Sequence, residues 1–157
     1  MELVSLTPLS PGSAESAFGR ATLERAATGE GWLAIAVATD DLDALAARLA
    51  LEVVEGQRER PGGELVRWRS AGLEDPRRTP SLPFFIAWEV PAELHPGRAR
   101  AGHGRRVEGI AGVDVGGDAA LLRDWLGGED LPIRAAPGPA GVRSVALVTP
   151  DGRLEIP

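Results

Sequence analysis

The hydrophobic and polar positions of this chain follow one pattern twice. Residues 33–90 and residues 107–156 each begin with alternating apolar positions, pass into a short stretch of helical periodicity behind an acidic residue, and return to strand-like alternation. Alternation with a period of two is typical of a β-strand, and apolar residues three and four apart are typical of an amphipathic helix. Because paired units of this kind build one sheet over a shared cavity, the pattern predicts an α+β domain with two related halves.

The first half is expected to contain one helix among several strands. Residues 32–39 predict a strand, because three large apolar residues alternate there with alanines. The pattern of residues 40–50 predicts a helix that begins at Asp40 or Asp41 and buries a stripe of leucines at positions 42, 45 and 49. Further strands are expected over residues 51–55, 64–69 and 82–90.

The second half repeats this order of elements. A strand is expected over residues 107–115, and a helix follows over residues 117–127 with Asp118 as its cap and two glycines at its end. The helix residues expected to face the sheet are Leu121, Leu122, Trp125 and Leu126. Two further strands are expected over residues 142–148 and 154–156.

The N-terminal segment has no counterpart in the repeat. Residues 1–6 predict a short strand, and Ser13 is expected to cap a helix that ends near Ala27. The whole chain of 157 residues is therefore interpreted as one domain. Its expected parts are an N-terminal strand and helix over residues 1–30, modules over residues 31–90 and 107–157, and a linker over residues 91–106.

The composition excludes several chemistries. The chain has no cysteine, lysine, asparagine or tyrosine, and all 17 of its basic residues are arginine. A GC-rich bacterial genome accounts for this bias, since the codons of lysine, asparagine and tyrosine are rich in A and T. The chain therefore cannot use a disulfide, a thiolate, a Schiff-base lysine or a tyrosine acid.

Charge and hydropathy narrow the expected partners. A net charge of -6 argues against nucleic acid as a partner, because its phosphates require a basic face. No run of about 18 apolar residues is present, and the first residues lack the basic and apolar regions of a signal peptide. We therefore expect a cytoplasmic protein without a membrane partner.

Three blocks of the sequence resemble a known family. These are WLAIAVATDDLDALAARL at residues 32–49, the later ELVRWR, and LPFFIAWEV at residues 82–90 followed by HPG and HG. They resemble the glyoxalase-like domain family of the vicinal oxygen chelate superfamily, which includes glyoxalases, bleomycin-resistance proteins and ring-cleaving dioxygenases. Over residues 31–157 the resemblance implies two paired βαβββ modules that form a curved, cup-like mixed sheet with its helices outside.

The resemblance also implies where a divalent metal would bind. Members of the superfamily often hold one with histidine and glutamate side chains from the first and last strands of each module, and the metal then acts as a Lewis acid. Glu155 lies closest to such a ligand position, and Glu89 and His95 are the further candidates. The first strand of the first module carries no histidine, and Ala87 replaces an acidic residue of the related motif. The ligand set is thus incomplete, so we expect no cofactor, with a divalent metal as the alternative.

A second candidate site follows from strand alternation. Along residues 84–89, Phe85 and Glu89 lie on the same face, and the arginines of the neighbouring VRWR segment alternate with Trp68. If these side chains share a cavity, they form an apolar wall with a charged clamp for a small carboxylate or carbonyl compound. The residues of this predicted ligand site are Trp68, Arg67, Arg69, Phe85 and Glu89. The alternative is an ion pair on the surface beside a packed core.

Three functions therefore remain open. The first is a cup-shaped protein that binds a small organic ligand without a complete metal site. The second is a lyase, isomerase or dioxygenase that depends on a divalent metal. The third is an interaction module whose open sheet is completed by a second copy in a homodimer.

Overall fold

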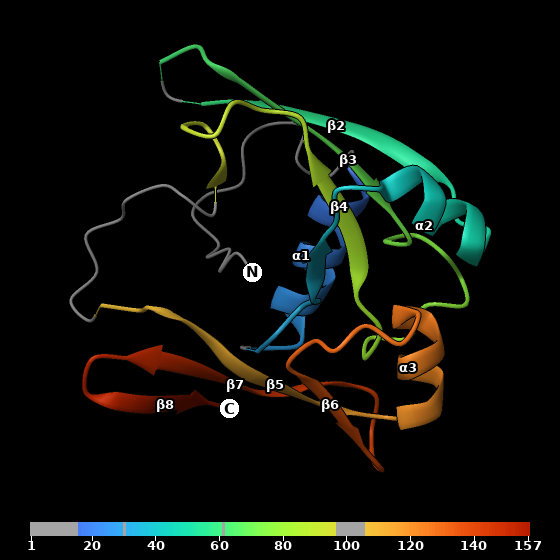
Figure 1. Cartoon of the computed structure of the whole chain (residues 1–157), viewed down its shortest axis with the longest axis vertical. Helices are drawn as coiled ribbons and strands as arrows, with labels where there is room; N and C mark the ends of the chain where they lie inside the picture. Colours follow the sequence, from blue (N-terminus) through green and yellow to red (C-terminus); the bar gives the residue numbers. More distant parts are fainter. Residues whose placement is uncertain (1–15, 30, 61, 97–105) are drawn as a thin grey trace. The chain divides into compact units, whose positions relative to one another are not determined.

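The computed structural model describes most of the chain as two compact units (Figure 1). The described residues are 16–29, 31–60, 62–96 and 106–157. Within them, unit 1 comprises residues 36–78 and 83–96, and unit 2 comprises residues 16–35, 79–82 and 106–157. Each unit contains one four-stranded mixed sheet, which confirms the predicted α+β class. No helix among these residues is long and apolar enough to cross a membrane.

Unit 1 has the element order βαβββ. Its strands, in order across the sheet, are β1 (Ala36–Ala38), β4 (Phe84–Trp88), β3 (Leu65–Ala71) and β2 (Val53–Glu59). β1 runs parallel to β4, whereas β3 is antiparallel to both β4 and β2. The helix α2 (Leu42–Leu49) connects β1 to β2 and packs against β2, β3 and β4. α2 therefore covers one face of this sheet, and the other face is the one opposite α2.

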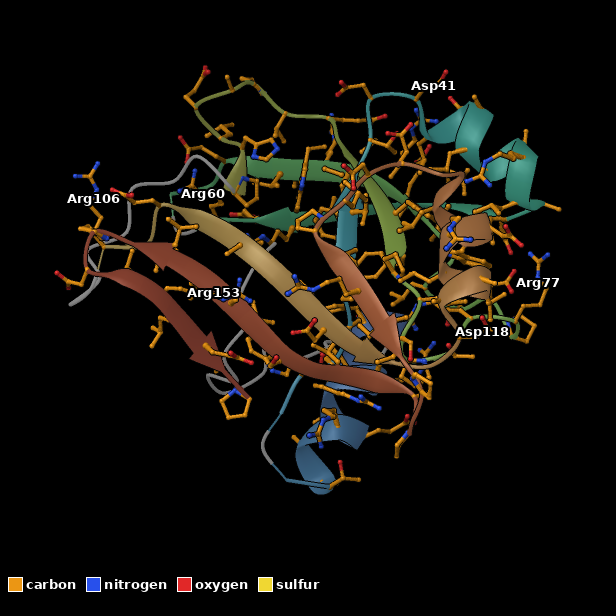
Figure 2. The ribbon with its side chains drawn as sticks, turned by 60° about the horizontal axis from the view of Figure 1, so that its bottom comes forward. Asp41, Arg60, Arg77, Arg106, Asp118 and Arg153 are labelled. Atoms are coloured by element: carbon orange, nitrogen blue, oxygen red, sulfur yellow. The ribbon has the colours of Figure 1, made fainter. Side chains whose placement is uncertain are left out.

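The start of α2 follows from the predicted acidic cap. The side chain of Asp41, labelled in Figure 2, accepts a hydrogen bond of 3.0 Å from the backbone N–H of Ala44. This bond satisfies a donor of the first helical turn that has no intrahelical partner. Leu42 and Ala46 are buried, whereas Leu45 and Leu49 are half-buried. The leucine stripe is thus the face that α2 turns towards the sheet.

The end of α2 lacks the usual glycine. Ala50 adopts the left-handed conformation there, with φ 51° and ψ 50°. The guanidinium of Arg77 donates hydrogen bonds of 2.9 and 3.1 Å to the backbone carbonyls of Leu49 and Ala50. Nη2 of Arg77 also lies 2.7 Å from Oδ2 of Asp75. The side-chain hydrogen bond from Arg77 is the main reason why the pKa of Asp75 is lowered. An arginine from the β3–β4 loop therefore binds the free carbonyls at the helix end.

Unit 2 also has the element order βαβββ, but its strands are arranged differently. Across the sheet they are β6 (Ile133–Ala136), β5 (Gly109–Gly116), β7 (Gly141–Thr149) and β8 (Gly152–Ile156). β5 runs parallel to β6, while β7 is antiparallel to both β5 and β8. The strand after the helix thus pairs directly with the first strand, whereas in unit 1 it lies at the far edge. The two halves share their order of elements and differ in strand pairing.

The helix α3 (Ala119–Leu126) covers the core of unit 2. Asp118 accepts hydrogen bonds of 2.7 and 3.2 Å from the first helical turn, and Gly127 ends the helix in the left-handed conformation, as predicted. Figure 2 labels Asp118 at the start of this helix. The buried residues of the helix and sheet are Leu122, Trp125, Leu126, Val113, Val115, Val145, Ala146 and Leu147. The prediction for Leu121 is wrong, because its side chain is 44% exposed.

The helix before the repeat belongs to unit 2. α1 (Ala17–Ala27) begins at Ser16, whose hydroxyl accepts a hydrogen bond of 3.0 Å from Gly19, so the cap lies nearer the helix than predicted. Arg25 donates to the carbonyl of Trp32 at 3.2 Å. The indole N–H of Trp32 in turn donates to the carbonyl of Pro157 at 3.1 Å. These contacts connect α1 to the end of β8.

The strands of both units differ in part from those expected. The strand expected over residues 32–39 is shorter, since only Ala36–Ala38 pairs with β4. The strand β6 was not predicted, although Leu131, Ile133 and Ala135 alternate with more exposed residues. The strand expected over residues 1–6, the cap at Ser13 and residues 97–105 of the linker lie outside the described residues.

Replacing Ala50 with glycine is expected to stabilise the protein. Glycine adopts the left-handed conformation without the clash of a Cβ atom, so Ala50→Gly should raise the free energy of unfolding by about 1 kcal/mol. Ala47→Gly, at an exposed position within α2, should lower it by about 1 kcal/mol. Urea denaturation followed by circular dichroism measures both changes, and equal signs for the two variants would contradict this account of the helix end.

Candidate functional site

Three aromatic side chains form a row in unit 1. Trp68 on β3 and Trp88 on β4 are direct partners in the antiparallel register, and their ring centroids lie 5.6 Å apart at an interplanar angle of 59°. The ring of His95, which follows β4, lies 5.8 Å from that of Trp88 in an edge-to-face arrangement with an interplanar angle of 63°. We call these three residues the aromatic row. Tilted and edge-to-face contacts of this kind are favourable arrangements for aromatic rings.

The aromatic row lies on the face of the sheet opposite α2. Successive side chains of a strand point to opposite faces, and Arg69 contacts Asp43 of α2. Trp68 and its partner Trp88 therefore point away from the helix. All three members of the row are half-buried. The same face carries the apolar side chains Val66, Phe84 and Ile86, which are buried. The row is thus an aromatic surface on an apolar base.

Gly56 on β2 allows Trp68 to lie flat on the sheet. Gly56 is the register partner of Trp68, and a Cβ atom at this position would stand 2.4 Å from Cε2 of the indole. Because side-chain carbons do not approach this closely, any larger residue would displace the indole. Glycine inside a strand often marks such a close approach. Gly56 therefore sets the position of one end of the row.

An ion network occupies the opposite face. The guanidinium of Arg69 donates to Asp43 at 2.8 Å through Nη1 and to Glu89 at 2.8 Å through Nε. These two carboxylates raise the pKa of Arg69, and the hydrogen bond that Arg69 donates to Asp43 is the largest cause. Arg69 thus joins α2, β3 and the end of β4. The network orients the strands whose other face carries the two tryptophans.

The structure places the predicted ligand-site residues on two faces. Arg67, Arg69, Phe85 and Glu89 share the face that α2 covers, and Trp68 lies on the other. Phe85 is part of the core and only 1% exposed. Arg67 is exposed. The structure therefore brings Arg69 and Glu89 together as an ion pair beside a packed phenylalanine, and it groups Trp68 with Trp88 and His95.

The predicted metal ligands have other contacts. Glu89 accepts from Arg69, and Glu155 on β8 accepts a hydrogen bond of 3.0 Å from the hydroxyl of Ser144. His95 lies against Trp88. Among residues 16–29, 31–60, 62–96 and 106–157, no three histidine, aspartate or glutamate side chains lie close enough to hold a metal ion. His103 lies outside the described residues.

The strands expected over residues 51–55 and 64–69 leave Gly56 outside both, whereas β2 continues through Gly56 to Glu59. A glycine within a strand indicates a close approach, but residues 56–63 are polar and rich in glycine, which is typical of a turn. The partner that approaches Gly56 depends on strand register, which no local pattern specifies. The row could therefore be recognised only once β2, β3 and β4 were paired.

One comparison with known proteins gives a match. The family model described as a glyoxalase-like domain matches residues 1–127, which include all the described residues of unit 1 together with α1, β5 and α3. Residues 128–157, which form β6, β7 and β8, lie beyond the match, although the resemblance in sequence was expected to extend through them. No curated protein and no solved structure matches the chain.

Gly56→Ala is expected to disturb the aromatic row. The added methyl group overlaps the indole of Trp68, so the free energy of unfolding should fall by about 1 to 3 kcal/mol. Near-ultraviolet circular dichroism should change as well, because the two tryptophans contact each other. Gly109→Ala on β5 is the matched control, since a Cβ atom there meets no other atom within 4 Å. Similar losses in the two variants would contradict the role assigned to Gly56.

Proposed function

We propose that this chain, which belongs to the glyoxalase-like domain family, binds a small planar organic molecule on its aromatic row. The observation that carries the proposal is the continuous contact of Trp68, Trp88 and His95 on the face of the unit 1 sheet opposite α2. Two half-buried indoles and an imidazole side by side form an uncommon surface for a protein in which aromatic Phe, Trp and Tyr residues make up only 4% of the sequence.

The angles between the rings support a planar ligand. Neighbouring rings of the row meet at 59° and 63°, so they do not stack on each other. A flat molecule can then stack on one ring while its edge meets the next, which are the two geometries that aromatic groups prefer. The imidazole of His95 adds a polar edge to a surface that is otherwise apolar. These features suit a planar aromatic compound better than a flexible aliphatic one.

Charge on the same face suggests which substituent the ligand carries. Arg58 on β2 is the register partner of Val66, so it lies on the face of the aromatic row. The glutamates on β2 and at the end of β4, which are Glu55, Glu59 and Glu89, belong to the opposite face. A cation on this face favours an anionic substituent, because opposite charges attract even when both are partly exposed. We therefore propose an aromatic carboxylate as the ligand class.

Calorimetric titration of the protein with 2-naphthoate tests this proposal. We expect saturable binding, and we expect Trp88→Leu and Trp68→Leu each to raise the dissociation constant by about tenfold, since an aromatic contact contributes about 0.5 to 1.5 kcal/mol beyond burial of its area. Trp32→Leu, in unit 2, should leave the dissociation constant unchanged. Cyclohexanecarboxylate, which has the same charge but no aromatic ring, should bind more weakly.

Two results would count against the aromatic row as the ligand site. One is binding of 2-naphthoate that the Trp68 and Trp88 variants leave unchanged. The other is equal affinity for the aromatic and the saturated carboxylate. Circular dichroism of each variant distinguishes loss of binding from loss of the fold.

A further inference from the structure

Among the described residues, β8 is an edge strand of the unit 2 sheet. β8 is at one end of the unit 2 sheet, and only β7 pairs with it among the strands of the described residues. Its five residues read Gly-Arg-Leu-Glu-Ile, and Figure 2 labels Arg153 on the C-terminal hairpin. Arg153 and Glu155 are exposed, and Leu154 is half-buried. An open edge presents backbone N–H and C=O groups on which another strand can pair.

The register of the hairpin identifies the backbone groups on this edge. β7 and β8 are joined by the two-residue turn of Pro150 and Asp151, with Thr149 opposite Gly152. In a two-residue hairpin the residues that flank the turn form a hydrogen-bonded pair, and bonded and non-bonded pairs alternate from there. Gly152, Leu154 and Ile156 therefore bond to β7. Arg153 and Glu155 direct their N–H and C=O groups to the open edge.

We propose that β8 pairs antiparallel with β8 of a second copy of this chain, about a twofold axis at Leu154. In this register Arg153 of each copy lies opposite Glu155 of the other. The same two residues exchange backbone hydrogen bonds, because they are the ones that face the edge. The pairing thus forms two cross-strand ion pairs once Arg153 turns from Gly112 of β5 and Glu155 from Ser144 of β7 towards the partner, and it aligns the two Leu154 side chains on the other face of the sheet.

The strand is self-complementary only in the antiparallel direction. Parallel pairing in register would set Arg153 against Arg153 and Glu155 against Glu155, which is unfavourable. Charged side chains on an edge strand usually prevent association with other strands. Here Arg153 and Glu155 carry opposite charges on either side of Leu154, so they favour a partner strand with the reverse order of charges. The partner with this complementarity is the strand itself, and a twofold axis satisfies both ion pairs at once.

The other edge strands of the described residues, β1, β2 and β6, are not self-complementary in charge. β1 and β6 have three and four residues, and Arg134 of β6 already pairs with Asp114 at 3.1 Å. Antiparallel pairing of β2 about Gly56 would set Glu55 opposite Gln57 and Val53 opposite Glu59, so no opposite charges would meet. Only β8 combines sufficient length with matching charges among the edge strands of the described residues.

A five-residue edge buries little surface, so the dimer should be reversible and its population should depend on concentration. This inference does not rest on the aromatic row, which belongs to unit 1. Failure of either proposal therefore leaves the other intact.

Sedimentation velocity from low micromolar to millimolar concentration tests the pairing. We expect a monomer–dimer equilibrium in the unaltered chain. Arg153→Glu should raise the dissociation constant by about tenfold, because it creates two like-charge contacts. The double variant Arg153→Glu with Glu155→Arg exchanges the two charges and should restore dimerisation. Arg123→Glu, on the exposed side of α3, is the matched control for the change of charge and should have no effect.

A second variant tests the backbone bonds. Glu155→Pro removes an N–H group that faces the open edge and leaves the ladder between β7 and β8 intact, so it should abolish the dimer while circular dichroism stays the same. A monomer at every concentration would overturn the proposal. A dimer that persists unchanged in both Arg153→Glu and Glu155→Pro would overturn it as well.

Discussion

The antiparallel register of β3 and β4 is the constraint on which unit 1 depends. It sets Trp68 opposite Trp88 on one face, and on the other it sets Arg69 where its guanidinium reaches both Glu89 and Asp43. A slip of one residue would exchange the two faces and place a tryptophan under α2 and an arginine beside the aromatic rings. The aromatic contact on one face and the ion pairs on the other therefore both require the same register. This register fixes the positions of Trp68 and Trp88.

Arginine has structural roles that lysine could not fill. Arg69 bonds two carboxylates through different nitrogens, and Arg77 bonds one carboxylate and two backbone carbonyls at the end of α2. These contacts use several donors of one planar guanidinium, whereas an ammonium group acts as a single point charge. The folded chain thus uses these arginines to connect a helix to the sheet that carries the aromatic row.

The two halves show the limit of inference from a repeat. Asp41 and Asp118 cap their helices as the sequence predicts, and Gly127 ends the second helix, because capping depends on residues within one turn. The order of strands in each sheet was not predictable in the same way. β2 and β6 both follow a helix, but β2 lies at the sheet edge opposite β1 whereas β6 pairs with β5. The family match ends at residue 127, before β6.

The sequence by itself determined what local physics controls: the α+β class, the N-terminal caps of α2 and α3, most of the strands and the alternation that separates Trp68 from Arg69. Tertiary structure decided which residues meet. It brought Gly56 under Trp68, His95 against Trp88 and Glu89 to Arg69, and it left β8 at an edge. Pairing between strands depends on the register and packing of the whole sheet, and residues distant in the sequence carry no local signal of that register.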